Sequence, residues 1–323
     1  MSAAPPTAPH NTPAARADTV QITPTDASRV RLTMAQALVR YLAVQQVRDD
    51  DGKIVPLFGG VFAIFGHGNV AGLGEALYHE RERLPTYRAH SEQGMANAAI
   101  AYAKAHMRRR MMAVTSSIGP GATNLVTSAA LAHVNRLPVL LLPGDVFVSR
   151  APDPVLQQLE DFGDGTVSVN DCLRPVSRYF DRIVRPEQLL SALPRALRVL
   201  TDPALCGPVT LALPQDVQAE AYDWPLSFFA PRLHTFRAPP PLAEEIAAVA
   251  NALRQAQRPV LIAGGGVLYG QASAALRHFA ERHRVPVAET QAGKGALAWD
   301  HPLQLGPAGV SGSTAANALL VEA

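Results

Sequence analysis

Short, continuously apolar runs that alternate with segments of helical periodicity constrain the fold of this chain most strongly. The runs VFAIF (61–65), MMAVT (111–115) and LPVLLLP (137–143) show no polar alternation. A strand that is apolar at nearly every position has to be covered on both faces, which is typical of a parallel sheet between two layers of helices. We therefore predict an α/β fold with right-handed crossovers between successive strands.

The alternation occurs in two blocks, which predict two domains. Residues 28–213 form the first block, and 242–323 form a shorter, Rossmann-like second block. The segment 214–241 is rich in proline and aromatic residues and is predicted to be a linker. The second block is too short for a complete open α/β sheet. We therefore expect the central domain to be truncated and the chain to be an N-terminal fragment; a small cap on the first domain is the alternative.

Composition excludes several classes of protein. The chain is 48% hydrophobic with a formal net charge of +2, which argues against a nucleic-acid partner. The basic run 108–110 is expected to be a solvated helix end. The longest apolar run is too short to span a bilayer, so no membrane partner is expected. Cys172 and Cys206 lack metal-ligand spacing and indicate reduced thiols in the cytoplasm. Residues 1–27 lack an apolar signal core and are expected to be a disordered tail.

Two glycine-rich turns follow predicted strands, where α/β sheets bind ligands. In GHGNVAGLG (66–74), the glycines allow close approach of a ligand, and His67 and Asn69 offer polar groups to it. In SSIGPGATN (116–124), Gly119 and Gly121 flank a proline, and the free amide groups of the following helix suit an anion or a heterocycle. A plain strand-to-helix turn explains each motif equally well.

Two further glycine motifs are less informative. GGGVLYG (264–270) follows a strand and opens a helix, but Tyr269 stands where G-x-G-x-x-G requires the third glycine, which argues against a nicotinamide site. The Gly-Asp-Gly at 163–165 is similar to a magnesium-diphosphate motif. However, no buried strand precedes it and no Asn pair follows at the required spacing, so we predict a surface turn.

The segment HSEQGMANAAIAYAKA (90–105) places one carboxylate, Glu92, at the head of a slim helix. An acid in the first turn favours the helix dipole, and Ser91 is a suitable cap, so an ordinary helix end explains Glu92 taken alone. A smooth face of alanines lies behind it, at 96, 99 and 103. A backbone or a flat ligand can approach such a face, and a carboxylate packed there would be desolvated and suited to hold or transfer a proton.

Taken together, these motifs resemble the pyrimidine-binding domain of thiamine-diphosphate enzymes. The match consists of the first glycine turn, then HSEQGMANAAIAYAKA, then TSSIGPGATNLVTSAALAHVNRLPVLLLPGD. RPVLIAGGGV, VPVAETQAGKGAL and HPLQLGPAGVSG are similar to the start of the central domain of these enzymes. Within this superfamily, IFGHGNVAGLGEAL, EQGMANAAIAYAKA and NDCLRPVSRYFDRI resemble the 3D-(3,5/4)-trihydroxycyclohexane-1,2-dione hydrolases of myo-inositol catabolism.

The resemblance implies roles for individual residues. The glutamate at the position of Glu92 hydrogen-bonds N1′ of the cofactor's aminopyrimidine ring and takes part in its proton relay. Gly119 and Gly121 are implied to lie against the cofactor, and His67 and Asn69 to contact substrate. Many superfamily members have His directly before the glutamate; here Ser91 intervenes, so His90 receives no role.

The implied reaction is the hydrolytic cleavage of a C–C bond in a cyclic polyhydroxy dione, giving 5-deoxyglucuronate. Thiamine diphosphate and Mg²⁺ are the implied cofactors, and a homodimer or homotetramer in the cytoplasm is the implied assembly. In the family a third domain binds the diphosphate and Mg²⁺. We therefore expect no metal ligands in this chain and no activity of the chain alone. Two alternatives remain: an acetolactate-synthase-like carboligase or decarboxylase, and a non-catalytic nucleotide-binding module built on the second domain.

Overall fold

The computed structural model describes residues 28–49, 51–151, 155–159, 161, 163–237 and 239–323. The predicted disordered tail, 1–27, lies outside the described residues.

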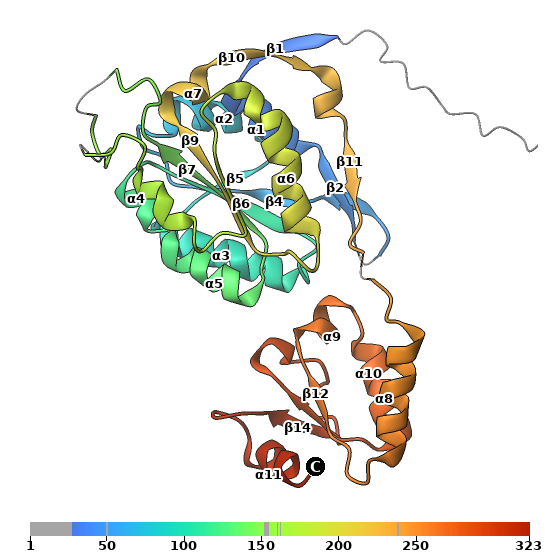
Figure 1. Cartoon of the computed structure of the whole chain (residues 1–323). Helices are drawn as coiled ribbons and strands as arrows, with labels where there is room; N and C mark the ends of the chain where they lie inside the picture. Colours follow the sequence, from blue (N-terminus) through green and yellow to red (C-terminus); the bar gives the residue numbers. More distant parts are fainter. Residues whose placement is uncertain (1–27, 50, 152–154, 160, 162, 238) are drawn as a thin grey trace, which may run out of the picture.

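A six-stranded sheet forms the centre of the first domain and confirms the predicted α/β fold (Figure 1). Its strand order is β5-β4-β6-β7-β9-β8, and every neighbouring pair is parallel. The strands are β4 (Phe58–Ala63), β5 (Thr86–Arg88), β6 (Met111–Ser116), β7 (Val139–Asp145), β8 (Tyr179–Arg182) and β9 (Pro208–Pro214). The apolar runs in the sequence thus become β4, β6 and β7, three adjacent strands.

Helices cover both faces of this sheet, as the apolar strands require. Helices α3 (Glu92–Ala105) and α5 (Val126–Asn135) lie on one face, with α4 (Pro120–Thr123) and η2 (Val169–Leu173) beside them. The other face is covered by α1 (Met34–Ala43), η1 (Val70–Gly74), α2 (Glu75–His79), η3 (Pro186–Gln188) and α6 (Leu189–Thr201). Alternate residues of β6 enter the two cores, Met112 and Val114 on the α3 side and Met111 and Ala113 on the other.

The predicted linker 214–241 is largely part of the first domain, so that prediction is wrong. It contains α7 (Gln215–Ala219), β10 (Ala221–Pro225), η4 (Leu226–Phe229) and β11 (Arg232–His234). Strand β10 pairs with β1 (Arg29–Thr33), and β11 pairs with β2 (Gln45–Arg48), which also pairs with β3 (Ile54–Pro56). Trp224 is fully buried and donates from Nε1 to the Leu32 carbonyl at 3.0 Å. The aromatic residues of the segment 214–234 therefore pack into the core of the first domain.

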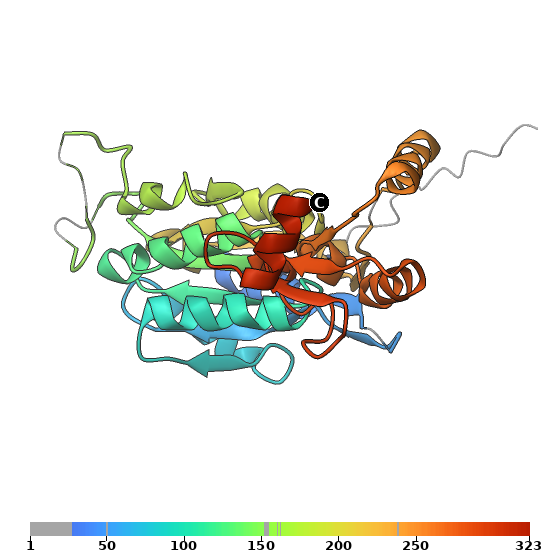
Figure 2. The same ribbon diagram turned by 90° about the horizontal axis from the view of Figure 1, so that it is seen from below.

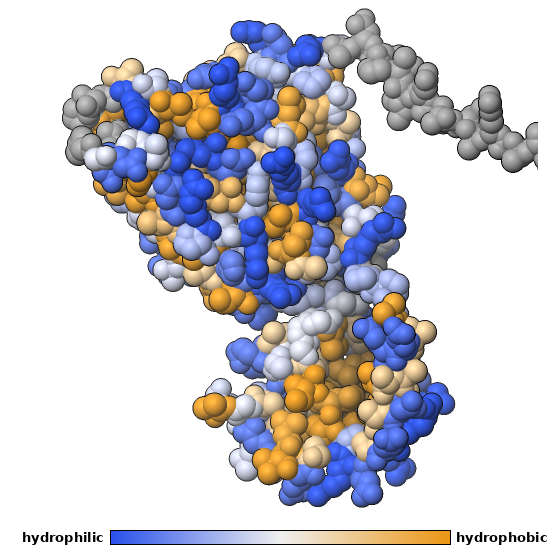
Figure 3. Space-filling view, in the orientation of Figure 1, coloured by the Kyte–Doolittle hydropathy of each residue, from blue (hydrophilic) through white to orange (hydrophobic). Residues whose placement is uncertain are grey.

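The second domain is a small α/β unit with a parallel sheet in the order β12-β13-β14. Its elements are α8 (Ala243–Gln255), β12 (Leu261–Ala263), α9 (Gly265–Tyr269), α10 (Ser273–His283), β13 (Val287–Glu289), η5 (Gln291–Gly293), β14 (Gln304–Pro307) and α11 (Thr314–Glu322). In α8 no residue is buried, and Figure 2 shows this helix standing away from the sheet. Apolar surface gathers on this domain (Figure 3), where Ile246, Val249 and Ile262 are exposed.

The basic run 108–110 lies at the contact between the two domains, so the prediction of a solvated helix end is wrong. The Arg108 guanidinium lies 3.5 Å from the centroid of the Tyr269 ring. Arg109 donates to Gln271 Oε1 at 2.7 Å, and Arg110 donates to the Pro56 carbonyl at 3.1 Å. Arg108 and Arg109 thus contact the second domain by stacking and hydrogen bonding, and Arg110 hydrogen-bonds within the first domain.

Within the part of the chain that the structure describes, no helix has both the length and the apolar character needed to cross a bilayer.

Candidate active site

The candidate site lies where three parallel strands end at one edge of the main sheet. Strands β4 and β6 are neighbours, with Ala63 opposite Thr115, so the turns that follow them meet at this edge. Strand β5 pairs with β4 on its other side and leads to α3, which brings Glu92 to the same place. This is the edge at which open α/β sheets bind ligands.

Glu92 occupies the first turn of α3, as the sequence predicts. Ser91 caps the helix, since its hydroxyl accepts a hydrogen bond from the Gly94 amide at 3.0 Å. One carboxylate oxygen, Oε2, accepts a hydrogen bond from Asn124 Nδ2 at 2.9 Å. Asn124 closes the second glycine turn, so the Glu92 side chain is held from that turn.

The alanine face of α3 packs against the protein. Ala96, Ala99 and Ala103 are fully buried, and Ala96 and Ala99 belong to a core shared with β6, α5 and β7. Of the two partners that the sequence allows for this face, the neighbouring backbone is the one observed. Glu92 itself is partly buried. It lies above the alanine face, at the mouth of a pocket.

The second glycine turn shapes this pocket through its missing side chains. A Cβ atom at Gly121 would lie 3.2 Å from Glu92 Oε1, so only a glycine leaves that oxygen approachable from this side. Gly119 has a φ of +63°, which strains any residue with a side chain. A Cβ atom there would also lie 2.0 Å from the Gln157 carbonyl oxygen. The missing side chain at Gly119 therefore allows the Gln157 carbonyl to lie close to this turn.

The pocket has a volume of about 640 Å³. Its walls combine apolar side chains from the first two turns with polar groups around Glu92. The lining residues are Ile64, Phe65, Gly66, Glu92, Ser117, Ile118, Pro120, Gly121, Thr123, Asn124 and Gln157. Sequence reasoning missed Asn124 and Gln157. The available signal for Asn124 was its place at the end of the glycine turn; Gln157 carries no motif of its own.

His67 and Asn69, the predicted substrate contacts, occupy different positions. Asn69 is buried: its Oδ1 accepts from the Gly66 amide at 2.9 Å, and its Nδ2 donates to Thr115 Oγ1 at 3.0 Å and to the Ile64 carbonyl at 3.2 Å. Its side chain therefore holds the first turn and faces away from the pocket. His67 Nε2 hydrogen-bonds the Leu156 carbonyl, in the segment that carries Gln157.

The two remaining glycine motifs agree with their predictions. Gly264 caps α9 after β12, as expected for a strand–turn–helix unit. Asp164 Oδ1 accepts hydrogen bonds from the amide and the hydroxyl of Thr166 in an exposed turn, as predicted for 163–165.

The residues around Glu92 suit an aminopyrimidine ring. Glu92 Oε1 faces the side-chain-free surface of Gly121 and has room for a ring N–H donor, while Ile64, Phe65 and Ile118 supply apolar walls for a flat ring. In the described part of the chain, no cluster of three or more His, Cys, Asp or Glu side chains is arranged to hold a metal ion.

Comparisons with known proteins bear on both domains. Residues 58–164 match the family model of the thiamine pyrophosphate enzyme N-terminal TPP binding domain, and residues 246–323 match that of the central domain. The chain is 54% identical over 296 residues to the 3D-(3,5/4)-trihydroxycyclohexane-1,2-dione hydrolase of Geobacillus thermodenitrificans, covering 92% of this chain and 46% of that protein.

Proteins of the same name from two other bacteria are similarly close. The identity is 51% for Lacticaseibacillus casei and 52% for Bacillus cereus, each over 294 residues, 91% of this chain and 46% of the relative. The chain thus spans about half the length of the curated relatives it matches. With both domain matches and this identity over nearly all its residues, the chain belongs to the thiamine pyrophosphate enzyme family and carries its N-terminal and central domains.

Proposed function

We propose that this chain supplies the pyrimidine-binding half of a hydrolase that opens 3D-(3,5/4)-trihydroxycyclohexane-1,2-dione to 5-deoxyglucuronate. The observation that carries the proposal is the seat of Glu92, whose carboxylate Asn124 holds at 2.9 Å against the bare surface of Gly121. The names of the relatives, at 51–54% identity, support the proposed substrate.

Glu92 acts as the proton-holding group of this site. Asn124 fixes Oε2, so Oε1 remains to accept a hydrogen bond from the ring N–H of an aminopyrimidine. When bound, thiamine diphosphate would supply a nucleophilic carbon for addition to a substrate carbonyl. Glu92 would control the protonation state of the cofactor's aminopyrimidine ring. The apolar walls would keep this ring in place and limit access of water.

The polar part of the pocket suits a polyhydroxylated ring. Ser117 and Gln157 carry hydroxyl and amide groups that can donate to and accept from substrate hydroxyls, and the Thr123 hydroxyl, which donates to the Pro120 carbonyl at 3.0 Å, can still accept. We assign no direct substrate contact to Asn69, because its amide is used within the turn; we propose that it positions this turn and that His67 positions the segment of Leu156.

The proposal extends to cofactor, assembly and compartment. We assign Mg²⁺ and the diphosphate to polypeptide other than the described residues; the relatives are about twice as long as the matched region.

Leu131 and Val134, on α5, are exposed apolar residues beside α3, and we propose that a second subunit covers them in a homo-oligomer. Cys172 and Cys206 are both free, as suits a cytoplasmic enzyme.

The test compares two first-turn carboxylates. Glu92→Gln removes the proposed proton-holding group, and Glu75→Gln changes an exposed acid at the start of α2, away from the pocket. The chain is isolated from its source cells with any polypeptide bound to it and assayed with thiamine diphosphate and Mg²⁺. We expect E92Q to lose about 10²–10⁴-fold in hydrolysis of the cyclic dione, and E75Q to keep full activity.

Two results would contradict the proposal. Wild-type rates in E92Q would show that the carboxylate has no part in the reaction. Turnover of pyruvate by the wild-type preparation, with none of the dione, would favour an acetolactate-synthase-like carboligase.

A further inference from the structure

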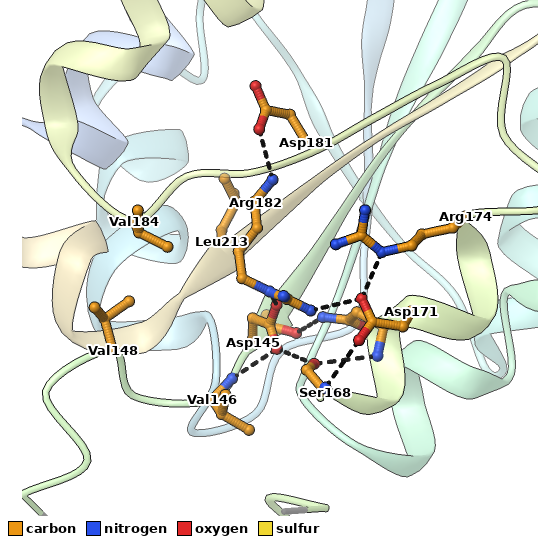
Figure 4. A network of polar contacts seen from close by, with 12 residues as sticks. Asp145, Val146, Val148, Ser168, Asp171, Arg174, Asp181, Arg182, Val184 and Leu213 are labelled. Carbon is orange, nitrogen blue, oxygen red and sulfur yellow. Dashed lines mark hydrogen bonds and ion pairs between the residues drawn. The ribbon is translucent and has the colours of Figure 1, made fainter. Parts of the chain in front are cut away.

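A second polar cluster lies at the ends of β7 and β8, outside the Glu92 pocket (Figure 4). Its centre is Asp145, the last residue of β7, which is fully buried. Asp145 Oδ2 accepts a hydrogen bond from Arg182 Nε at 2.7 Å. Its Oδ1 accepts from the Val146 amide at 2.8 Å and from the Ser168 hydroxyl. The buried carboxylate therefore has partners from three segments of the chain.

Asp171 completes the cluster. Its Oδ1 accepts from Arg182 Nη2 at 3.0 Å and from Arg174 Nε at 2.7 Å, and its Oδ2 accepts from the Ser168 amide at 3.0 Å. Burial by itself would raise the pKa of Asp171, but the Ser168 amide and the two guanidinium groups together hold the pKa below its ordinary value. The cluster thus pairs two carboxylates with two guanidinium groups.

The cluster closes the base of a loop. The chain leaves the main sheet after Asp145 and begins η2 just after Ser168, so the Asp145–Ser168 hydrogen bond joins the two ends of the intervening segment. Asn170 strengthens the same closure by donating to the Gly144 carbonyl at 2.8 Å. Here we call the described residues between Asp145 and Ser168, namely 146–151, 155–159, 161 and 163–167, the β7–η2 loop.

The described part of this loop reaches the Glu92 pocket. Gln157 lines the pocket, and its carbonyl lies against the bare face of Gly119. The Leu156 carbonyl meets His67, and Gln158 Oε1 accepts from the Phe147 amide at 3.3 Å. Residues 156 and 157 therefore contact both glycine turns. The base of the loop is held by the hydrogen bond between Ser168 and Asp145.

A buried ion pair is a poor source of net stability, because desolvation of the charges offsets their attraction, and its best-attested use is to fix one arrangement. We propose that Asp145, Ser168 and Arg182 are positioning residues, which hold the base of the β7–η2 loop and thereby keep Gln157 at the rim of the Glu92 pocket. The catalytic consequence rests on the proposed function; the anchoring itself does not.

The test removes one hydroxyl from the cluster. Ser168→Ala deletes the donor to Asp145 but keeps the Arg182 ion pair. Thr166→Val is the matched control, because Thr166 also donates a hydroxyl to a carboxylate in this loop, at 2.6 Å to Asp164, but in an exposed turn outside the cluster. Ser168→Thr is the conservative rescue; residue 168 borders a pocket of about 190 Å³ that has room for a methyl group.

Trypsin reports the state of the loop, because Arg150 lies in it and is exposed. We expect cleavage after Arg150, identified by fragment mass, to be about tenfold faster in S168A than in wild type, T166V and S168T. In an active preparation, S168A should raise the KM for the dione several-fold and leave binding of thiamine diphosphate unchanged, since Glu92 and Asn124 are not touched.

Unchanged cleavage after Arg150 in S168A would overturn the anchoring. Faster cleavage with wild-type KM and kcat would overturn the positioning role. Absence of dione hydrolysis in the wild type would count against the proposed function alone, and the cleavage rates would still decide whether the cluster anchors the loop.

Discussion

Trp224 offers the sharpest test of the boundary of the first domain. It lies on β10, inside the segment whose composition suggests a linker, yet it is fully buried. Its ring lies 5.5 Å from that of Phe228, in a stacked arrangement, and 5.1 Å from that of Tyr222, edge to face. If β10 and η4 belong to the core of the first domain, shortening this side chain must cost substantial stability.

The magnitude for Trp224→Phe follows from these contacts. Loss of ring atoms from a fully buried site, with the cavity left behind, costs about 1.5 kcal/mol. Loss of the hydrogen bond from Nε1 to the Leu32 carbonyl costs about 1 kcal/mol more. We expect the free energy of unfolding of the first domain to fall by about 2.5 kcal/mol, which corresponds to a decrease of about 1 M in the urea midpoint.

The chain contains a natural control. Of its two tryptophans, Trp299 is 90% exposed, so Trp299→Phe should change stability by no more than about 0.5 kcal/mol. In W299F the fluorescence comes from Trp224 alone and reports unfolding of its surroundings, while circular dichroism follows W224F. Equal urea midpoints for W224F and W299F would refute the packing of 214–234 into the first domain.

Two further outcomes follow from the structure. Gly119→Ala should lower the free energy of unfolding by about 2 kcal/mol or more, because it adds a clash with the Gln157 carbonyl to a strained φ. Gly52→Ala, at φ +80° with open space around it, should lower it by about 1 kcal/mol. Thermal unfolding of the two variants measures this difference. Burial, with the nearby charge of Arg232, lowers the pKa of His234 from 6.5 to about 4. The unfolded chain therefore takes up this proton first as the pH falls, and stability should decrease between about pH 6.5 and 4; His234→Gln should remove this part of the slope in urea titrations, and an unchanged slope would contradict the assignment.

The main sheet was predictable because the sequence of a single strand already indicates that both of its faces are buried. Three of the strands are apolar at almost every position, and that pattern has few explanations other than a sheet covered on both faces. Right-handed crossovers limit how these strands can be connected, whereas their order and register are given by the structure. Residues 111–116 illustrate the point, since both sets of alternate side chains enter a core.

The segment 214–234 was not predictable in the same way. Strands β10 and β11 have five and three residues, and both pair with strands close to the start of the described chain. Pairing over such a sequence distance leaves no local periodicity, and proline and aromatic residues fit a linker as well as a core. The environment of Arg108 and Arg109 was not predictable for a similar reason, because their partners Tyr269 and Gln271 lie in the other domain.

In the candidate site, the sequence identified the reactive group better than its neighbours. Glu92 stands out as a lone acid before an alanine face, and its motif resembles a known family. Asn124 and Gln157 become visible only when separate segments meet around the pocket. Asn69 was predicted to contact substrate because a polar residue in a glycine turn can bind a ligand or stabilise the turn. Its three hydrogen bonds in the structure are all made within and beside the turn.

The glycines at this edge set distances between turns, and this differs from their expected role of admitting a ligand. A Cβ atom at Gly68 would lie 2.7 Å from the Ile118 amide nitrogen, and one at Gly144 would lie 2.7 Å from the Gly68 carbonyl oxygen. The turns after β4 and β6 and the end of β7 are thus in close contact through their backbones. Any added side chain has to push them apart, and Asn124 would then move relative to Glu92. Catalytic geometry here is therefore sensitive to residues that have no chemistry of their own.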